Sequence, residues 1–147
     1  MGLRVIAIDT GSSKRDMCLS LGAVAFFDFK STANMLSEVR AITKSGAHGV
    51  LVAAGSSAAY NASCAYLRPT GTLLVVGLPP DTTLDQPLVL LGALGLNVKG
   101  IFIGNRKDAV DALELVATGK VKVNYTIRPL SELDQCVGVN PSDITFC

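Results

Sequence analysis

The residues that could carry chemistry in this sequence are polar side chains placed close to the ends of short apolar runs. Acid–base chemistry needs a titratable or hydrogen-bonding group beside the reacting atom, and in open α/β sheets such groups gather at the carboxyl ends of the strands. The candidates are Asp9, Tyr60, Asn61, Asn105 and Arg106, with Asp28 and His48 less well placed. Structural alternatives stand beside them: Tyr60 fits a core stripe, Asp28 a turn, and Arg106 a solvent-facing helix start.

Stronger catalytic motifs are missing from the sequence. Gly55-Ser56-Ser57 follows an apolar run but lacks the glycine two residues after the serine that a nucleophile elbow requires, so we interpret it as a helix cap. There is no Walker loop and no spaced carboxylate pair. His48 is the only histidine, and without spaced partners it predicts a loop or packing role and no metal site. The four cysteines form no CxxC pair and are expected to be reduced thiols.

Composition favours a folded, soluble domain. Hydrophobic residues make up 49% of the 147 residues and charged residues 17%, which is enough apolar surface for a core. The net charge is +1, and the charges are scattered, so neither nucleic acid nor a membrane is expected as a partner. With no export signal and a longest apolar run too short to span a bilayer, a cytoplasmic location is expected.

Short apolar runs alternate along the chain with segments of helical period. The runs that predict strands are Leu3–Ile8, Ala23–Phe29, Gly49–Ala54, Thr72–Val76 and Asn97–Ile103. Helices are predicted between them, starting at Ser12 or Ser13, at Thr32 or Asn34, at Ser56 or Ser57, at Pro87 and at Arg106. This alternation predicts an α/β fold in which a parallel sheet is covered by helices on both faces.

Several stretches resemble the cofactor-binding domain of medium-chain, zinc-type alcohol dehydrogenases of the yeast and fungal kind. The matching stretches are 4–9 (RVIAID), 46–50 (GAHGV), 77–79 (GLP) and, most specifically, 100–106 (GIFIGNR). Each is weak alone, but their order and spacing cover some nine-tenths of the chain. The resemblance implies a Rossmann-like fold with a parallel sheet and helices on both faces.

The resemblance also implies a set of residues that would bind NAD. Asp9 would accept hydrogen bonds from the adenosine ribose hydroxyls, and its negative charge would disfavour the 2′-phosphate of NADP. Lys14 would reach the same ribose. Backbone groups of Gly77-Leu78 and Phe102-Ile103 would line the nicotinamide end. An Asp before Gly11-Ser12-Ser13 is also a good turn former, which is the structural alternative for Asp9.

Parts of the family pattern are not found in this sequence. The glycine-rich G-x-G-x-x-G turn that holds the pyrophosphate would precede residue 3, and the family's last helix and strand would follow residue 137. We therefore expect a truncated Rossmann-like domain over 1–137, lacking the first βα unit, and a divergent tail over 138–147. NAD affinity is expected to be weak, and zinc is not expected because the family's cysteine and histidine ligands are missing.

The missing first strand is the central one of the usual order, so a gap is expected in the sheet. Three arrangements could close it: the strands at Leu3–Ile8 and Gly49–Ala54 pair directly, Val121–Ile127 fills the place, or a second copy supplies a strand. The family also pairs the strand at 97–103 across a two-fold axis, so the resemblance implies a homodimer.

Three functions remain open from the sequence. The chain could be an alcohol-dehydrogenase-like nucleotide-binding module that keeps the adenosine half of the cleft but is no complete zinc-dependent dehydrogenase. It could instead be a small non-redox isomerase or cyclase, for example of fungal secondary metabolism, that uses the remaining cleft for a small-molecule ligand. The third hypothesis is a fragment without a selected function.

Overall fold

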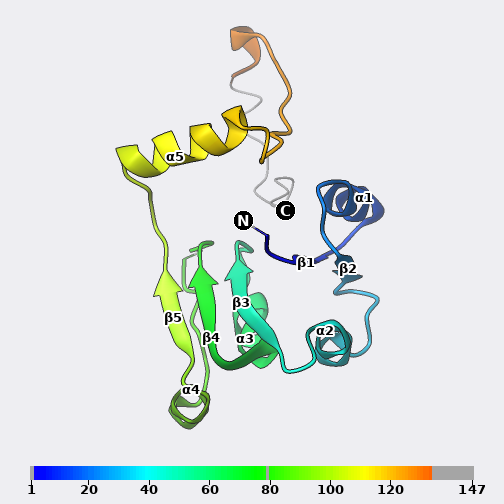
Figure 1. Ribbon diagram of the computed structural model, residues 1–147, viewed down its shortest axis with the longest axis vertical. Coiled ribbons are helices and arrows are strands. Elements are labelled where there is room, and N and C mark those ends of the chain that lie inside the picture. Colours follow the sequence, from blue (N-terminus) through cyan, green and yellow to red (C-terminus); the bar gives the residue numbers. More distant parts are fainter. Residues whose placement is uncertain (1, 79, 134–147) are drawn as a thin grey trace. The chain divides into compact units, whose positions relative to one another are not determined.

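The computed structural model describes residues 2–78 and 80–133 (Figure 1), so the tail expected at 138–147 lies outside the described residues. The strands are β1 (Ile6–Asp9), β2 (Ala25–Asp28), β3 (Ala47–Val52), β4 (Leu67–Val75) and β5 (Asn97–Gly100). The helices are α1 (Ser12–Ser20), α2 (Met35–Thr43), α3 (Ser57–Tyr66), α4 (Leu88–Leu94) and α5 (Arg106–Ala117), followed by the short 3-10 helix η1 (Leu130–Glu132). The predicted alternation is therefore confirmed element by element. Two compact units form: residues 27–103, and residues 1–26 with the chain from 104 onward.

The unit of residues 27–103 is built on a three-stranded parallel sheet in the order β3-β4-β5 (Figure 1). Val50 lies beside Leu73, and Leu73 lies beside Val98 on the next strand. Helix α3 lies behind β3 and β4 in Figure 1 and contacts both strands. Parallel strands need such crossover helices because their connections must return to the same end of the sheet. The parallel α/β architecture expected from the sequence is thus confirmed.

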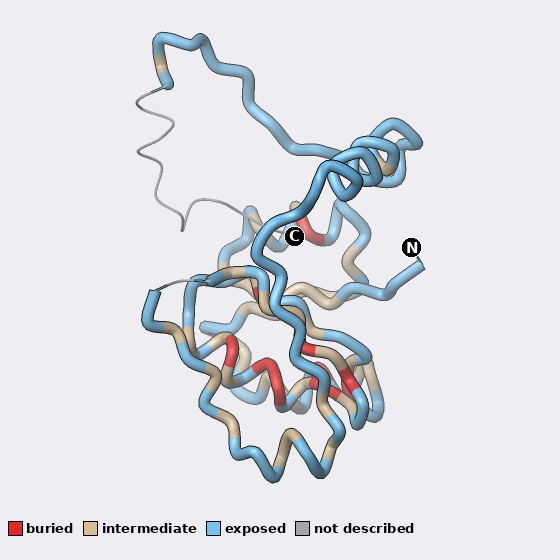
Figure 2. The backbone as a smooth tube through the Cα atoms, turned by 90° about the vertical axis from the view of Figure 1, so that its left-hand side faces the viewer, coloured by how far each residue is buried: buried red, intermediate tan, exposed pale blue. Residues whose placement is uncertain are grey.

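The core of this unit lies between α3 and the sheet. It consists of Val52 on β3, Tyr60 and Cys64 on α3, and Leu67 and Leu73 on β4. The i, i+4 spacing of the two α3 residues puts both on one helix face, as the sequence predicted. Figure 2 shows the buried segments gathered in this region. The opposite sheet face is less covered, since Leu51 on β3 is 60% exposed.

Strand β4 begins earlier than the sequence predicted. In the sequence, Pro69 and Gly71 predict a break between the helix that starts at Ser56 or Ser57 and the next strand, but α3 ends at Tyr66 and β4 starts at once with Leu67. The ladder with β3 is interrupted here: Ala47 pairs with Leu67 and Gly49 with Thr72. Thr70, inside this interval, has a φ of 63°. Proline and glycine therefore mark a bulge within the strand and no boundary.

The remaining sheet has two neighbouring strands, β1 and β2. Helix α1 follows β1 but is not capped by serine as predicted; its N-cap is Gly11, with a φ of 101° that a residue with a Cβ rarely adopts. One of the three arrangements proposed for the gap is wrong for the described residues, because residues 121–127 form no strand. Direct pairing of the strands at 3–8 and 49–54, and a strand supplied by a second copy, stay predictions.

Helix α5 differs from the sequence expectation in its packing. The helical spacing of Val110, Leu113, Leu115 and Val116 predicts that these residues face inward, yet Val110 is 62% and Leu113 69% exposed. Its N-terminus does form well, through a capping box between Asn105 and Asp108. An amphipathic period predicts that a face favours burial, but it does not say where the covering surface lies. In the described part of the chain, no helix is long and apolar enough to cross a membrane.

Candidate functional site

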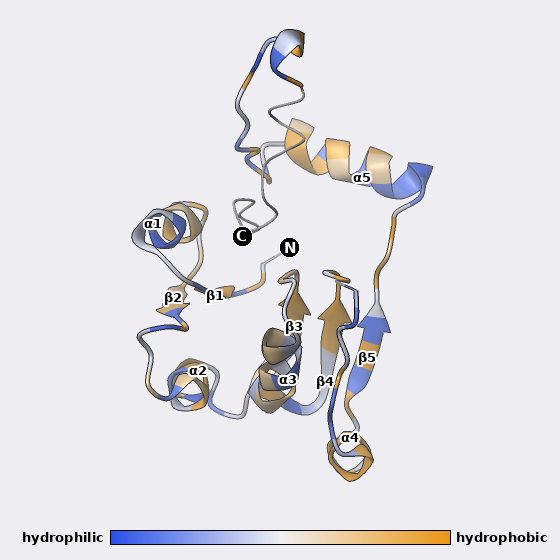
Figure 3. Ribbon diagram, turned by 180° about the vertical axis from the view of Figure 1, so that it is seen from behind, coloured by the Kyte–Doolittle hydropathy of each residue, from blue (hydrophilic) through white to orange (hydrophobic). Residues whose placement is uncertain are grey.

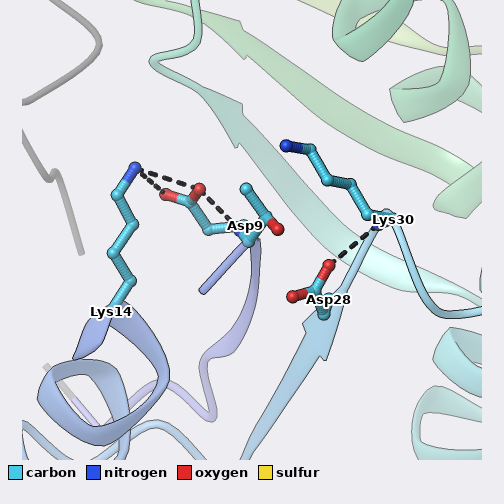
Figure 4. Close-up of polar contacts among 5 residues, drawn as sticks. Asp9, Lys14, Asp28 and Lys30 are labelled. Carbon is cyan, nitrogen blue, oxygen red and sulfur yellow. Dashed lines mark hydrogen bonds and ion pairs between the residues drawn. The ribbon is translucent and has the colours of Figure 1, made fainter. Parts of the chain in front are cut away.

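Asp9 and Lys14 form an ion pair at the carboxyl end of β1 (Figure 4). The Asp9 Oδ1 accepts a hydrogen bond from the Thr10 N–H at 2.7 Å. The Lys14 Nζ lies 3.1 Å from Oδ1 and 3.1 Å from Oδ2. The side chains of Lys14 and Asp9 are 25% and 28% exposed. The ion pair is therefore partly shielded from water while both charges stay accessible from solvent.

The local sequence explains this geometry. Asp9 ends an apolar strand, Gly11 turns the chain, and Lys14 then lies in the first turn of α1, with the N–H of Arg15 donating to the Gly11 carbonyl at 3.1 Å. Sequence reasoning missed the Thr10 amide, although aspartate before a glycine turn often accepts a hydrogen bond from nearby backbone. Asp28 at the end of β2 makes a similar local contact: its Oδ1 accepts from the Lys30 N–H at 2.9 Å (Figure 4).

A second group of predicted residues lies at the carboxyl ends of the parallel strands β4 and β5. Gly77-Leu78 follows β4, and Phe102-Ile103 follows β5, which is its neighbour in the sheet. The two connections are held together where they begin, since the Ile101 N–H donates to the Val75 carbonyl at 2.8 Å. The side chains are open to solvent: Leu78 is 51%, Phe102 81% and Ile103 80% exposed. The structure thus brings these four residues to one edge of one sheet.

Tyr60 and Asn61 both have engaged polar groups. The Tyr60 side chain is buried, and its hydroxyl is hydrogen-bonded to backbone carbonyls of Val52 and Gly77. Burial raises the pKa of the Tyr60 phenol above its usual value. The Asn61 Oδ1 accepts from the Asp85 N–H at 2.9 Å, and the Asn61 carbonyl accepts from Gln86 at 2.9 Å. Both residues therefore hold backbone segments in place.

Asn105 and Arg106 lie at the start of α5. The Asn105 side chain accepts from the N–H groups of Lys107 and Asp108 at 2.8 and 3.2 Å, and Asp108 accepts from the Asn105 N–H at 2.7 Å. Two of the four N–H groups left unpaired at the helix start, those of Lys107 and Asp108, are thereby satisfied. Arg106 is exposed. The capping role accounts for the asparagine without any catalytic function.

The metal-ligating residue types do not gather in the described part of the chain. His48 is exposed on β3, and no group of three or more His, Cys, Asp or Glu residues that could hold a metal ion occurs among the described residues. Cys64 is a free, buried thiol, and burial is the main cause that raises its pKa. Cys18 is disulfide-bonded, so the expectation of reduced thiols is wrong for this residue.

Comparison with known proteins agrees with this fold. Residues 1–118 match the family of zinc-binding dehydrogenases. The chain belongs to this family. Alcohol dehydrogenase 1 of Emericella nidulans is 38% identical over 135 residues, which are 90% of this chain and 39% of that protein. The fungal resemblance predicted from the four sequence stretches is thereby confirmed.

Solved structures show the same relationship. The alcohol dehydrogenase of Aeropyrum pernix has a TM-score of 0.79 and 25% identity over 90% of this chain and 38% of its own. A zinc-binding dehydrogenase of Sinorhizobium meliloti, solved with bound NADP, has a TM-score of 0.71 and 25% identity over 82% of this chain and 36% of its own. The chain therefore spans about two fifths of the length of the proteins that it matches, and it corresponds to their Rossmann-like part.

Proposed function

We propose that this chain is the nucleotide-binding portion of an alcohol-dehydrogenase-like protein and that it binds the adenosine half of NAD through Asp9 and Lys14. The observation that carries the proposal is the partly exposed Asp9 carboxylate at the end of β1, held from two sides by Lys14 and the Thr10 amide. A carboxylate at a strand's carboxyl end is the group that accepts hydrogen bonds from ribose hydroxyls in Rossmann-like domains. The residues present fit that half of the nucleotide.

Charge supports NAD over NADP as the preferred ligand. A 2′-phosphate beside the Asp9 carboxylate would place like charges together, and the Lys14 ammonium is already paired with both carboxylate oxygens. The Sinorhizobium meliloti structure was solved with NADP, so the fold itself accommodates either dinucleotide, and the proposed preference of this chain rests on the charge of Asp9. We expect this chain to bind NAD more tightly than NADP.

The nicotinamide half would meet the backbone groups of Gly77-Leu78 and Phe102-Ile103. This assignment is supported by the position of these residues, which lie exposed after the ends of neighbouring parallel strands. Ligands of open α/β sheets bind at such strand ends. Bound NAD would serve as the acceptor of a hydride. The residues of this chain would bind and orient the nucleotide, and we do not propose zinc-dependent alcohol oxidation for this chain alone.

We further propose that the chain forms a homodimer through the strand region 97–103. Strand β5 is one of the two outer strands of its sheet, and all four of its residues are exposed, with Val98 at 48%. An uncovered sheet edge with apolar side chains favours pairing with another chain. We also propose a cytoplasmic location. No described observation favours the isomerase or cyclase alternative.

Isothermal titration of the purified chain with NAD and with adenosine tests the proposed function. We expect heat of binding with both ligands, and a larger affinity for NAD. If neither NAD nor adenosine gives a heat of binding, the proposal is ruled out. Oxidation of ethanol by the chain alone, with NAD present, would instead show that its function is wider than nucleotide binding.

A further inference from the structure

The Tyr60 hydroxyl joins two backbone segments that are distant in the sequence. Tyr60 lies on α3 and is only 2% exposed. Its hydroxyl lies 3.3 Å from the Val52 carbonyl oxygen at the end of β3 and is also hydrogen-bonded to the Gly77 carbonyl oxygen just after β4. A phenylalanine would fill the same core space, so the hydroxyl is not needed for apolar packing. Its role is to hydrogen-bond the backbone carbonyl groups at the end of the sheet.

The backbone at this point is already crowded. The N–H groups of Val76 and Gly77 each donate to the Val52 carbonyl at 3.0 Å. A Cβ added at Gly77 would lie 2.7 Å from the Ala53 carbonyl oxygen and 2.8 Å from its carbonyl carbon. The chain leaving β4 is therefore pressed against the end of β3. Only a residue without a side chain allows this approach.

A phenol has a single proton to donate. The Val52 carbonyl already accepts from two amides, whereas the Tyr60 hydroxyl is the donor found for the Gly77 carbonyl among the described residues. Desolvation raises the pKa of Tyr60, which keeps the phenol neutral and able to donate. The bond to Gly77 therefore fixes the orientation of the Gly77 peptide, and Leu78, half exposed, follows directly.

We propose that Tyr60 is a positioning residue for the nicotinamide half of the dinucleotide: its buried hydroxyl holds the Gly77-Leu78 turn in a conformation ready for the ligand. This inference rests on the proposed function. A turn that is rigid before binding loses less conformational freedom when the ligand arrives, and that difference appears as affinity. The residue does not touch the ligand, so its effect is confined to the part of the nucleotide that contacts the turn.

The test compares Tyr60→Phe with Tyr66→Phe in the full chain. Tyr66 lies on the same helix, and its hydroxyl makes no hydrogen bond to another described residue. Binding of NAD and of ADP-ribose, which lacks the nicotinamide, is measured by titration. We expect Tyr60→Phe to weaken NAD binding by about three- to tenfold, as for one lost hydrogen bond, and to leave ADP-ribose unchanged. Tyr66→Phe should change neither.

The outcomes separate this inference from the proposed function. If the unaltered chain binds neither ligand, the proposed function fails and the role of Tyr60 fails with it. If the unaltered chain binds both but Tyr60→Phe changes both equally, or neither, only the inference about Tyr60 is overturned. Should Tyr60→Phe not fold, hydrogen exchange of the unaltered chain decides. NAD, but not ADP-ribose, must then slow exchange at residues 76–78, and equal effects of the two ligands would overturn the inference.

Discussion

At the scale of single residues, charge and burial assign different roles to groups that look alike in the sequence. Asp9 and Asp108 both accept a hydrogen bond from a nearby backbone N–H. Asp108 completes a helix cap, whereas Asp9 also pairs with a lysine through both oxygens and remains accessible. Asp108 is exposed as well, so Asp9 differs from it in its lysine partner and in its place at the carboxyl end of a strand. The distinction depends on surroundings that the sequence does not display.

Replacement of Asp9 should change nucleotide preference. Asp9→Asn removes the charge that we propose accepts hydrogen bonds from ribose, and it releases Lys14 from its ion pair. We expect NAD affinity to fall by about tenfold or more, as for a lost charge-assisted hydrogen bond, and NADP to bind at least as well as NAD. Titration with both nucleotides measures this. Asp16→Asn on the exposed side of α1 is the matched control, and equal losses in the two variants would count against a specific role for Asp9.

Stability should fall at alkaline pH because buried acids of the core resist ionisation. The pKa of Cys64 is raised above its ordinary value of 9.0, and that of Tyr60 above 10.0. The unfolded chain loses these protons first as pH rises, so the free energy of unfolding is full below pH 9.0 and declines above it. Urea unfolding between pH 7 and about 10.5 measures the decline. Cys64→Val should make the fall in the free energy of unfolding with pH smaller. If the fall is as large in this variant, it arises from other groups.

At the scale of elements, backbone contact between strand ends matters as much as side-chain packing. Gly77→Ala places a Cβ against the Ala53 carbonyl at 2.7 Å, which requires the end of β3 or the following turn to move. We expect a loss of about 1–3 kcal/mol in the free energy of unfolding, as for other steric insertions into packed sites. Denaturant unfolding measures this loss.

Gly92→Ala provides the control for that variant. Gly92 lies within α4, and an added Cβ meets nothing within 4 Å. Alanine in a helix interior is favoured over glycine by about 0.5–1 kcal/mol, so this variant should be slightly stabilised. If Gly77→Ala proved as stable as Gly92→Ala, the close approach of the two strand ends would not constrain the fold.

The elements themselves could be predicted from the sequence, because apolar period and helix caps are local properties. The strands around Ile6, Val50 and Leu73 and the α3 stripe of Tyr60 and Cys64 lie where their patterns indicated. The early start of β4 could not be predicted, since Pro69 and Gly71 punctuate bulges as well as boundaries. Figure 3 shows apolar residues along β3 and β4 but polar ones within β5.

The candidate site was predictable only in part. Asp9 and Lys14 were named from a family resemblance, and the structure adds that they are paired. The hydrogen bond from Tyr60 to Gly77 joins residues 17 positions apart, and no local pattern specifies it. The exposure of α5 was missed for a related reason: hydrophobic period identifies a face, while the covering surface is a property of the tertiary or quaternary arrangement.

At the scale of the whole molecule, the uncovered edge of β5 predicts association. Val98→Lys places a charge within this edge strand, where all residues are exposed, so the monomer should fold normally while the proposed pairing is disfavoured. Sedimentation analysis should give a dimer mass for the unaltered chain and a monomer mass for the variant. Lys122→Glu, an exposed change outside the sheet, is the control. A monomer mass for the unaltered chain would contradict the dimer.

The central claim is that the end of β1 binds the adenosine part of a dinucleotide. Amide NMR of the full chain during titration with ADP-ribose tests it most directly. The account predicts saturable shifts of the Thr10 and Lys14 signals, and their loss in Asp9→Asn. Saturable binding that leaves these two signals in place, or no binding at concentrations well above those of cellular nucleotides, would contradict it.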